Sequence, residues 1–289
     1  VHLWSDVPVH PYFAAQGVRQ LPVVDDAHFP VVGTLLVGGV HVTLGPWLDA
    51  MRPARVVLRY NLPNHQRLFD AITRIRNATG QDPELVFVSR MLQSAVGLPG
   101  RVEPSLIRLD RFLADPVVRT PQSAVTVGRL SRDVIEKHDP QDIALYRMLV
   151  ARGMRVRLMG GCCLAPLLAG IDGITLLPAG SEPADRFLRS LDIFFYRTGS
   201  FVEPYGRVVL EAMASGLPVV AAANGGFAEQ IRQGEDGVLV TNQEEAVQAL
   251  LLLAAHVELR QRIGVAARER AIALHGAAAV SHMLAHYLQ

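Results

Sequence analysis

Two glutamates and a glycine lie close together in a pattern that suits the binding of a phosphorylated ligand. Glu203 precedes Pro204, and Glu211 follows eight positions later within an apolar run of helical length. Pro204 suits the first helical position, and Gly206 leaves the backbone at the helix start without a side chain. Free amides at a helix N-terminus, together with the helix dipole, favour a bound anion. This one segment therefore combines phosphate donors, a neighbouring carboxylate, and a second carboxylate that could accept from a vicinal diol.

The segments on either side of this helix indicate a buried parallel sheet. Gly216 and Pro218 end the helix, and Val219–Ala222 reads as a short, wholly apolar strand. Ile193–Tyr196 is the apolar strand that leads into the loop carrying Glu203. Strands and helices alternate in this way through most of the chain, which predicts an α/β fold.

The alternation occurs in two separate stretches. In the first, we predict strands at 2–4, 34–37, 55–60 and 85–88 and helices at 64–77 and 90–96. In the second, we predict strands at 124–127, 156–159, 174–177, 193–196, 219–222 and 238–240, with helices at 140–152, 183–190, 227–233, 244–255, 258–274 and 277–288 besides the central one. Prolines mark 115–122 as the linker between them. The predicted domains are residues 1–118, residues 119–275 and a C-terminal helix at 276–289.

Composition excludes several classes of protein. The 289 residues carry a net charge of +1, so no general attraction to nucleic acid is expected. No apolar run approaches the roughly 20 residues of a membrane span. The two cysteines, Cys162 and Cys163, are adjacent and form no zinc-binding spacing, and no Asp-x-Asp metal motif occurs. We therefore expect neither a metal nor a cofactor.

The basic residues are strongly biased, with 27 arginines and a single lysine, Lys137. A position that keeps lysine in such a chain suits a compact point charge better than a planar guanidinium. Arg129 lies eight residues before it, after the predicted strand 124–127. Ligands of open α/β sheets bind beyond the carboxyl ends of strands, where this loop begins.

A family resemblance is carried by residues 203–221, EPYGRVVLEAMASGLPVVA, which resemble the E-x7-E signature of retaining glycosyltransferases with the GT-B fold, in particular family 4. The segment Gly128-Arg129-Leu130-Ser131, followed by Lys137, resembles the G-R-L-x(n)-K-G loop of the same family. Here the spacing is longer than usual, and His138 replaces the usual glycine. The resemblance covers residues 123–289 well and residues 85–118 loosely.

The resemblance implies two Rossmann-like domains facing across a cleft, with the last helix crossing back to the first domain. It also implies retaining transfer of a sugar from a nucleotide-diphosphate donor to a glycan, lipid-linked or other hydroxyl acceptor, in cell-surface polysaccharide synthesis. The family's N-terminal domain opens with a strand, a glycine-rich loop and a helix. None of these precedes the predicted strand at 2–4, so we expect a short or truncated acceptor-side domain.

The resemblance also implies roles for particular residues. The catalytic set would be Glu203, Arg129 and Lys137, with the two cations at the diphosphate. The donor-binding set would be Glu211 at the ribose, the segment Tyr205, Gly206, Arg207 and Val208 at the phosphates, and Gly160 and Leu177 near the base. We expect Glu203 to lack a partner until the sugar is present. His2 and His41 are the candidates for a histidine from the first domain.

Other functions stay open at this point. A nucleotide-sugar-binding protein with impaired catalysis would have the same donor residues, and a GT-B-fold epimerase would share the fold. A phosphorylase is disfavoured because its pyridoxal-phosphate lysine belongs deep in the second domain, whereas Lys137 lies in an early loop. The expected location is the cytoplasm, with association at the inner face of the membrane left open, and no nucleic-acid partner is expected.

Overall fold

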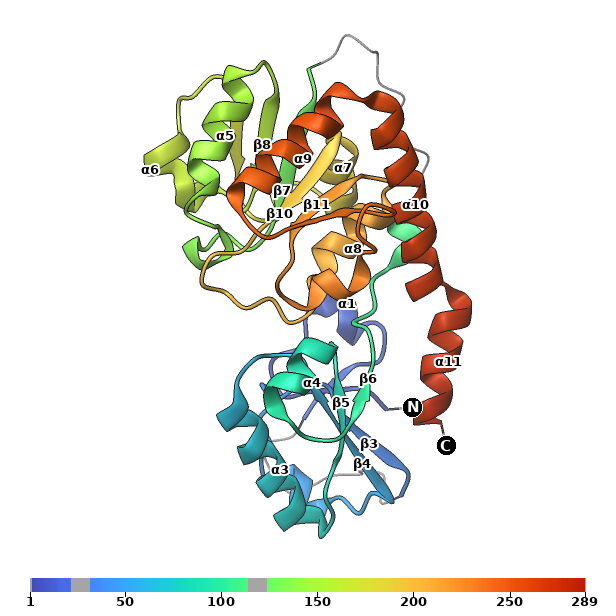
Figure 1. The fold of residues 1–289 in the computed structure, drawn as a ribbon. Helices are drawn as coiled ribbons and strands as arrows, with labels where there is room; N and C mark the ends of the chain where they lie inside the picture. Colours follow the sequence, from blue (N-terminus) through green and yellow to red (C-terminus); the bar gives the residue numbers. More distant parts are fainter. Residues whose placement is uncertain (1, 22–31, 114–123, 289) are drawn as a thin grey trace. The chain divides into compact units, whose positions relative to one another are not determined.

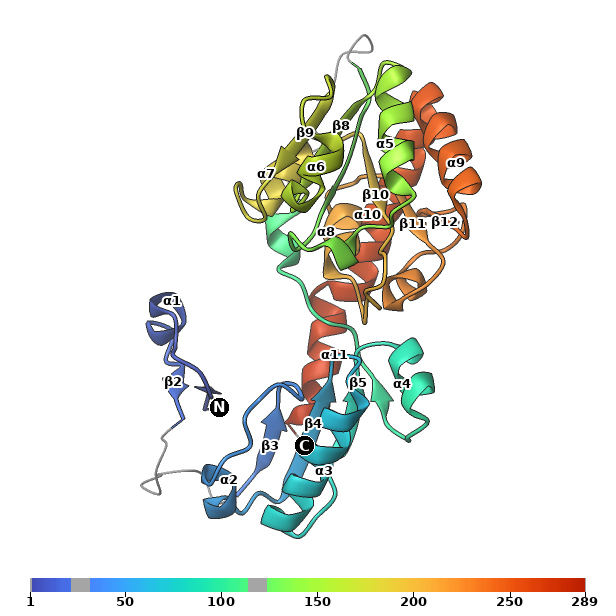
Figure 2. The same cartoon turned by 90° about the vertical axis from the view of Figure 1, so that its left-hand side faces the viewer.

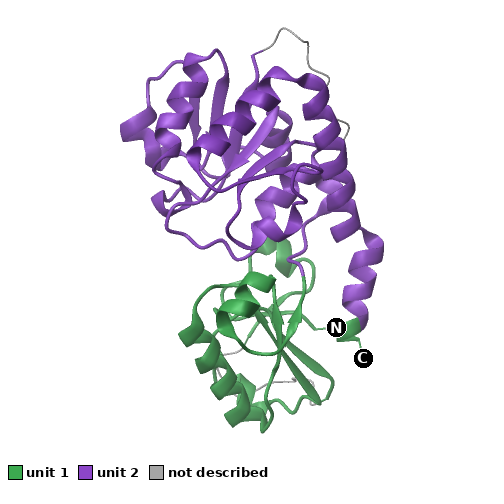
Figure 3. Cartoon of the chain, in the orientation of Figure 1, with its two compact units in different colours: residues 1–103, 286–289 green, residues 104–285 purple. Residues whose placement is uncertain are grey.

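The computed structural model describes residues 2–21, 32–113 and 124–288 (Figure 1). The chain divides into two compact units, which are coloured separately in Figure 3. Unit 1 comprises Val1–Glu103 together with His286–Gln289, and unit 2 comprises Pro104–Ala285. Both units contain parallel β-sheets accompanied by helices, so the α/β class predicted from the sequence is confirmed.

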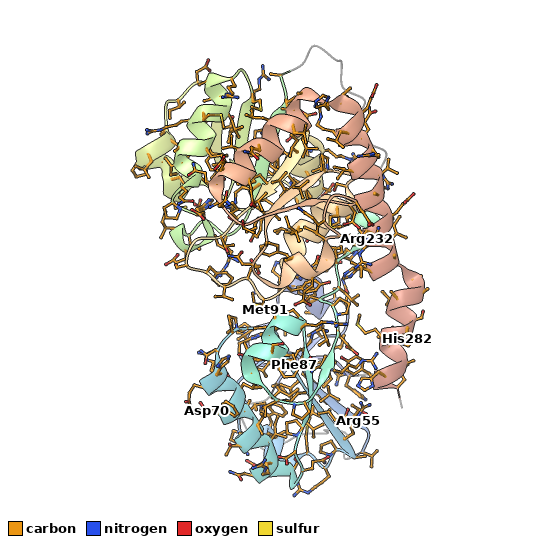
Figure 4. The ribbon with its side chains drawn as sticks, viewed as in Figure 1. Arg55, Asp70, Phe87, Met91, Arg232 and His282 are labelled. Carbon is orange, nitrogen blue, oxygen red and sulfur yellow. The ribbon has the colours of Figure 1, made fainter. Side chains whose placement is uncertain are left out.

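Unit 1 is built on a four-stranded parallel sheet with the order β3-β4-β5-β6. The strands are β3 (Thr34–Val37), β4 (Arg55–Tyr60), β5 (Glu84–Phe87) and β6 (Arg101–Val102). The helices are α1 (Pro11–Ala14), α2 (Trp47–Ala50), α3 (His65–Thr79) and α4 (Arg90–Val96), and β1 (Trp4–Ser5) pairs with β2 (Arg19–Gln20). Figure 4 marks Phe87 and Arg55 on the strands, Asp70 on α3 and Met91 on α4.

Helix α3 forms where the sequence supplies a capping residue at each end and an apolar face between them. The Asn64 side chain caps the first turn by accepting the Arg67 amide at 3.0 Å. Gly80 ends the helix in the left-handed conformation. Between these ends, the buried residues recur at helical spacing: Leu68, Ala71 and Ile75. This face packs the helix against the sheet of unit 1.

Unit 2 contains a six-stranded parallel sheet with the order β12-β11-β10-β7-β8-β9. The strands are β7 (Thr126–Leu130), β8 (Arg155–Met159), β9 (Ile174–Leu177), β10 (Ile193–Tyr196), β11 (Val219–Ala222) and β12 (Val238–Val240). Numbered from β7, this is the doubly wound order 3-2-1-4-5-6. The order reverses between β7 and β10, and in such sheets ligands bind at that reversal, beyond the carboxyl ends of the strands.

Helices cover both faces of this sheet and complete two hydrophobic cores (Figure 2). One core includes residues of α7 (Ala184–Arg189), α8 (Arg207–Ala214) and α10 (Val257–His275). The other includes residues of α5 (Asp142–Ala151), α6 (Ala165–Leu168) and α9 (Gln243–Ala255). Short 3-10 turns complete the unit: η1 (Leu109–Arg111), η2 (Ile135–Lys137), η3 (Cys162–Leu164) and η4 (Gly226–Gln230). The last helix is α11 (Ala277–Tyr287).

Three local expectations differ from the structure. Pro204 is not the first helical residue, because α8 begins at Arg207 after Gly206 adopts a left-handed φ of 75°. Glu211 therefore lies in the second turn of the helix. The predicted helix at 227–233 is instead the short turn η4, and the predicted strand at 2–4 is Trp4–Ser5.

The division into units falls between Glu103 and Pro104, whereas the sequence placed the end of the first domain at residue 118. Phe112 accounts for the difference, because it is buried in a core of unit 2. Arg268 of α10 also donates to the Leu113 carbonyl. The predicted linker at 115–122 lies outside the described residues.

Gly160 should tolerate alanine much less well than Gly153, although both have left-handed φ angles, of 79° and 80°. A Cβ at Gly160 would lie 2.0 Å from the Ser131 carbonyl oxygen, while a Cβ at Gly153 would meet nothing within 4 Å. The backbone strain costs roughly 1–2 kcal/mol at either position. The clash should add about 1–3 kcal/mol at Gly160 alone.

Urea titrations followed by circular dichroism would give the free energies of unfolding of Gly160→Ala and Gly153→Ala. Equal losses of unfolding free energy in the two variants would show that the close approach of Gly160 to the loop after β7 does not limit which residue fits there.

Candidate functional site

The single lysine and the first of the two glutamates meet at the point where the strand order of unit 2 reverses. Lys137 lies in η2, which follows β7, and Glu203 lies in the loop that follows β10. Lys137 Nζ is 2.5 Å from Glu203 Oε2, and the two side chains are 8% and 13% exposed. Few water molecules can solvate so enclosed a pair, so its electrostatic interaction is stronger than that of a surface ion pair.

Glu203 has a second partner within unit 2. The hydroxyl of Tyr196, the last residue of β10, donates to the same Oε2 at 2.8 Å. Oε1 accepts a hydrogen bond from none of the described residues. The expectation that Glu203 lacks a partner before a sugar arrives is therefore wrong, because strand β10 and the lysine loop converge on it. One carboxylate oxygen is occupied and the other is available.

The Lys137 ammonium also contacts an aromatic ring. It lies 3.6 Å from the ring centroid of Phe201, in cation–π geometry. Burial lowers the pKa of Lys137, and the adjacent Glu203 carboxylate opposes that shift. Removing Glu203 from this environment without supplying another anion would therefore disfavour the charged lysine.

Arg129 is fully buried next to the backbone of Lys137. Its guanidinium donates to the Lys137 and Arg197 carbonyls, at 2.6 Å in each case, and lies 4.7 Å from the Tyr196 ring centroid. Sequence reasoning assigned Arg129 to the phosphates. The structure instead uses its donors to connect the loop after β7 with the residue that follows β10. We conclude that Arg129 positions the backbone of Lys137 and the ring of Tyr196.

The start of α8 offers backbone donors beside Glu203. Gly206 is the N-cap residue, and no side chain caps this helix. The amides of Arg207 and Val208 donate to no acceptor among the described residues. Glycine is needed at this cap, because a Cβ on Gly206 would lie 2.7 Å from Cβ of Phe227. The geometry is that of an anion site at a helix N-terminus.

Glu211 projects from α8 as a half-buried carboxylate with no hydrogen-bond partner in the described part of the chain. Burial raises its pKa to about 7, and the nearby cations Arg207 and Arg111 only partly oppose this. Hydrogen-bond donors such as the hydroxyls of a ribose would stabilise its charged form.

Gly160 and Leu177, predicted near the base, are brought together at the ends of β8 and β9. The Gly160 amide donates to the Leu177 carbonyl at 2.8 Å. His138, which replaces the usual glycine, is buried with Nε2 2.9 Å from the Gly160 carbonyl oxygen. Burial, followed by the charge of Arg129, lowers the pKa of His138 to about 4. His138 is therefore neutral at physiological pH and connects the loops after β7 and β8.

Tyr205 is mostly buried, and its hydroxyl lies 2.9 Å from His275 Nε2 at the end of α10. Burial lowers the pKa of His275 to about 4, so this partner is neutral. Tyr205 thus holds the loop before α8 against α10, which differs from the direct donor contact expected from the sequence. His2 and His41 are exposed residues of unit 1.

Sequence reasoning missed Tyr196 and Phe201. An aromatic residue at the last position of a strand, and another two positions before Glu203, were the available signals. Within residues 2–21, 32–113 and 124–288, no group of three or more metal-ligating side chains is found. None of the helices in the same ranges is sufficiently long and apolar to cross a membrane.

Comparison with known proteins shows that part of unit 2 is similar to glycosyltransferases. Residues 166–270 match the family described as Glycosyl transferases group 1. Trehalose synthase of Pyrococcus horikoshii is 37% identical over 95 residues, which are 33% of this chain and 22% of that protein. The chain spans between 6% and 35% of the length of the first curated relatives it matches.

Solved structures extend the similarity to the fold of both units. The Anabaena protein HepE, in complex with UDP and glucose, superposes with a TM-score of 0.64 at 17% identity, covering 80% of this chain and 70% of that one. WaaG, a glycosyltransferase involved in lipopolysaccharide biosynthesis, superposes with a TM-score of 0.65 at 14% identity, covering 99% and 90%. The fold is therefore GT-B-like, as predicted, and the family match supports a glycosyltransferase.

Glu211→Gln should stabilise unit 2 in a pH-dependent way. The pKa of Glu211 is about 7 in the folded protein, compared with the ordinary 4.5. The folded state then binds the proton more tightly than the unfolded chain, so this group lowers stability as pH rises from about 4.5 to 7. Glutamine removes the effect, so the stability gained by the variant should grow by on the order of 1–3 kcal/mol between pH 5 and pH 8.

Urea titrations at both pH values would measure this difference. Glu269→Gln, at an exposed position of α10, is the matched control and should show little change. A gain in Glu211→Gln that is the same at pH 5 and pH 8 would contradict the assigned protonation.

Proposed function

We propose that this protein is a retaining glycosyltransferase that moves a sugar from a nucleotide-diphosphate donor to a hydroxyl acceptor. The observation that carries the proposal is the convergence of Lys137 and Glu203 at the strand reversal of unit 2, beside the open amides of α8. A cation and free amides suit a diphosphate, and a carboxylate suits sugar hydroxyls. The glycosyltransferase match over residues 166–270 supports this assignment.

The donor would lie along the carboxyl edge of the sheet. Glu211 would accept from the ribose hydroxyls, and the amides at Arg207 and Val208 would donate to the diphosphate. Lys137 would bind the phosphate that leaves the sugar, since its compact ammonium matches a single oxygen. Gly160 and the end of β9 would lie near the base. HepE, whose structure holds UDP and glucose, supports a nucleotide-sugar donor for this fold.

In the proposed reaction, the bond between the anomeric carbon and the phosphate oxygen breaks while the acceptor oxygen bonds to that carbon on the same face. The departing phosphate oxygen takes the proton of the acceptor hydroxyl, so no protein base is needed. Negative charge grows on the phosphate as the bond breaks, and Lys137 with the α8 amides would stabilise it. The free Oε1 of Glu203 would accept from a sugar hydroxyl and orient the ring.

We propose a glycan or lipid-linked acceptor, in cell-surface polysaccharide synthesis. WaaG, which resembles this chain in fold, is involved in lipopolysaccharide biosynthesis and supports that choice. In this proposal Arg129 contributes by holding the Lys137 carbonyl, because its side chain is fully buried. Neither a metal nor a cofactor is part of the proposed reaction.

Lys137→Ala should weaken donor binding by about 1.5–3 kcal/mol, as expected for loss of a charge-assisted hydrogen bond. Arg262→Ala, which removes an exposed cation from α10, is the control and should bind normally. A thermal-shift panel of UDP-glucose, GDP-mannose and ADP-glucose would first identify the donor, because a ligand stabilises the folded protein by an amount that rises with the logarithm of its concentration relative to its Kd. Calorimetry with that donor would then compare the variants.

Wild-type protein that is stabilised by none of these donors and by none of the free nucleoside diphosphates would overturn the proposed function. Normal donor affinity in Lys137→Ala would show that a group other than Lys137 binds the phosphate. Binding without any turnover would favour the alternative of a nucleotide-sugar-binding protein.

A further inference from the structure

Tyr196 shares one carboxylate oxygen with Lys137, although nothing in the donor chemistry described above requires it. Its hydroxyl donates to Glu203 Oε2 at 2.8 Å, and Lys137 Nζ contacts the same atom at 2.5 Å. If a diphosphate attracts the ammonium of Lys137, Oε2 keeps only the phenol as a partner among the described residues. Glu203 is then held in place only as firmly as the phenol itself is fixed.

The ring of Tyr196 is fixed on several sides. Phe194 stacks near it with a centroid separation of 6.0 Å, and Phe227 meets it edge-on at 5.4 Å. Arg129 lies 4.7 Å from the ring centroid on a face of the ring. The side chain is 1% exposed. The ring is therefore held in place, with its hydroxyl bonded to Glu203.

The Tyr196 phenol is a hydrogen-bond donor to Glu203. Burial, followed by the charge of Glu203, raises the pKa of the Tyr196 phenol far above its ordinary value. The hydroxyl therefore keeps its proton at neutral pH, where it does not act as a base. Its contribution to the reaction has to pass through the position of Glu203.

We propose that Tyr196 is a positioning residue that holds Glu203 toward the transferred sugar while Lys137 moves from Glu203 to the donor diphosphate. This role rests on the proposed function. Before the donor binds, Glu203 neutralises the buried ammonium; afterwards the diphosphate does so, and the phenol alone keeps Oε2 in place. Oε1, which accepts from none of the residues described, then remains aimed at the sugar hydroxyls.

Because Lys137 changes its partner from Glu203 to the diphosphate, Tyr196 affects turnover separately from nucleotide binding. A nucleoside diphosphate lacks the sugar, so its affinity depends on Lys137, the α8 amides and Glu211 rather than on the orientation of Glu203. The stability of the transition state for sugar transfer depends on the orientation of Glu203 as well. An interaction made chiefly in the transition state lowers kcat and kcat/KM together.

The test compares Tyr196→Phe with Tyr146→Phe. Tyr196→Phe keeps the ring contacts and removes only the hydroxyl. Tyr146 is the matched control, because it is also fully buried in unit 2, beside Phe195, and its hydroxyl donates to none of the described residues. Both variants would be assayed for the Kd of UDP, GDP or ADP, whichever binds the wild type, and for turnover of the corresponding sugar nucleotide by hydrolysis, which needs no acceptor.

Tyr196→Phe should keep the nucleoside diphosphate Kd within about twofold of wild type and lower kcat by roughly 10-fold or more, since a hydrogen bond to a charged group is lost. Tyr146→Phe should match wild type in both measurements. Wild-type kcat in Tyr196→Phe, or a loss of nucleotide affinity as large as the loss in kcat, would overturn the role of Tyr196 alone. Wild-type protein that neither binds a nucleotide nor consumes any donor would overturn the proposed function and this role with it.

Discussion

A buried ammonium must have an anion beside it, and this requirement organises the candidate site of unit 2. The side chain of Lys137 is 8% exposed, and Glu203 supplies the negative charge from the loop after a different strand. The two loops meet because the sheet reverses its strand order between β7 and β10. Removing one member of such a pair leaves an uncompensated buried charge, which is strongly destabilising. A diphosphate can replace the carboxylate, so the same requirement that stabilises the fold also favours the proposed ligand.

Arg129 supports this arrangement because its hydrogen bonds connect the two loops. Two of its donors bind the Lys137 and Arg197 carbonyls, which would otherwise lie unsatisfied near the strand ends. Hydrogen bonds to charged groups contribute roughly 1.5–3 kcal/mol each, so the guanidinium holds both loops firmly. The same cation lies on the ring of Tyr196. A single buried residue thus positions the cation, the phenol and, through them, the carboxylate.

The local pattern of the sequence predicted most strands of the two larger sheets. The strands 34–37, 55–60, 174–177, 193–196, 219–222 and 238–240 were placed at their observed bounds, because short runs rich in apolar residues are typical of buried parallel strands. The burial of Arg129 was not predicted, since a motif gives a residue's place in the chain and says nothing of its burial. Tyr196 was missed because its role comes from a loop seven residues away and from a lysine 59 residues away, and both contacts exist only after folding.

The most direct measurement uses the fact that Lys137 is the only lysine in this sequence. Protein labelled with ¹⁵N at lysine gives a single Nζ signal in NMR spectra, whose shift reports on the ammonium and its partner. Titration with UDP, GDP and ADP should move this signal for the nucleotide that binds, and the corresponding nucleoside without phosphates should leave it unchanged. A signal that stays in place at saturating nucleoside diphosphate would contradict the account, because the ammonium would then have kept Glu203 as its partner throughout.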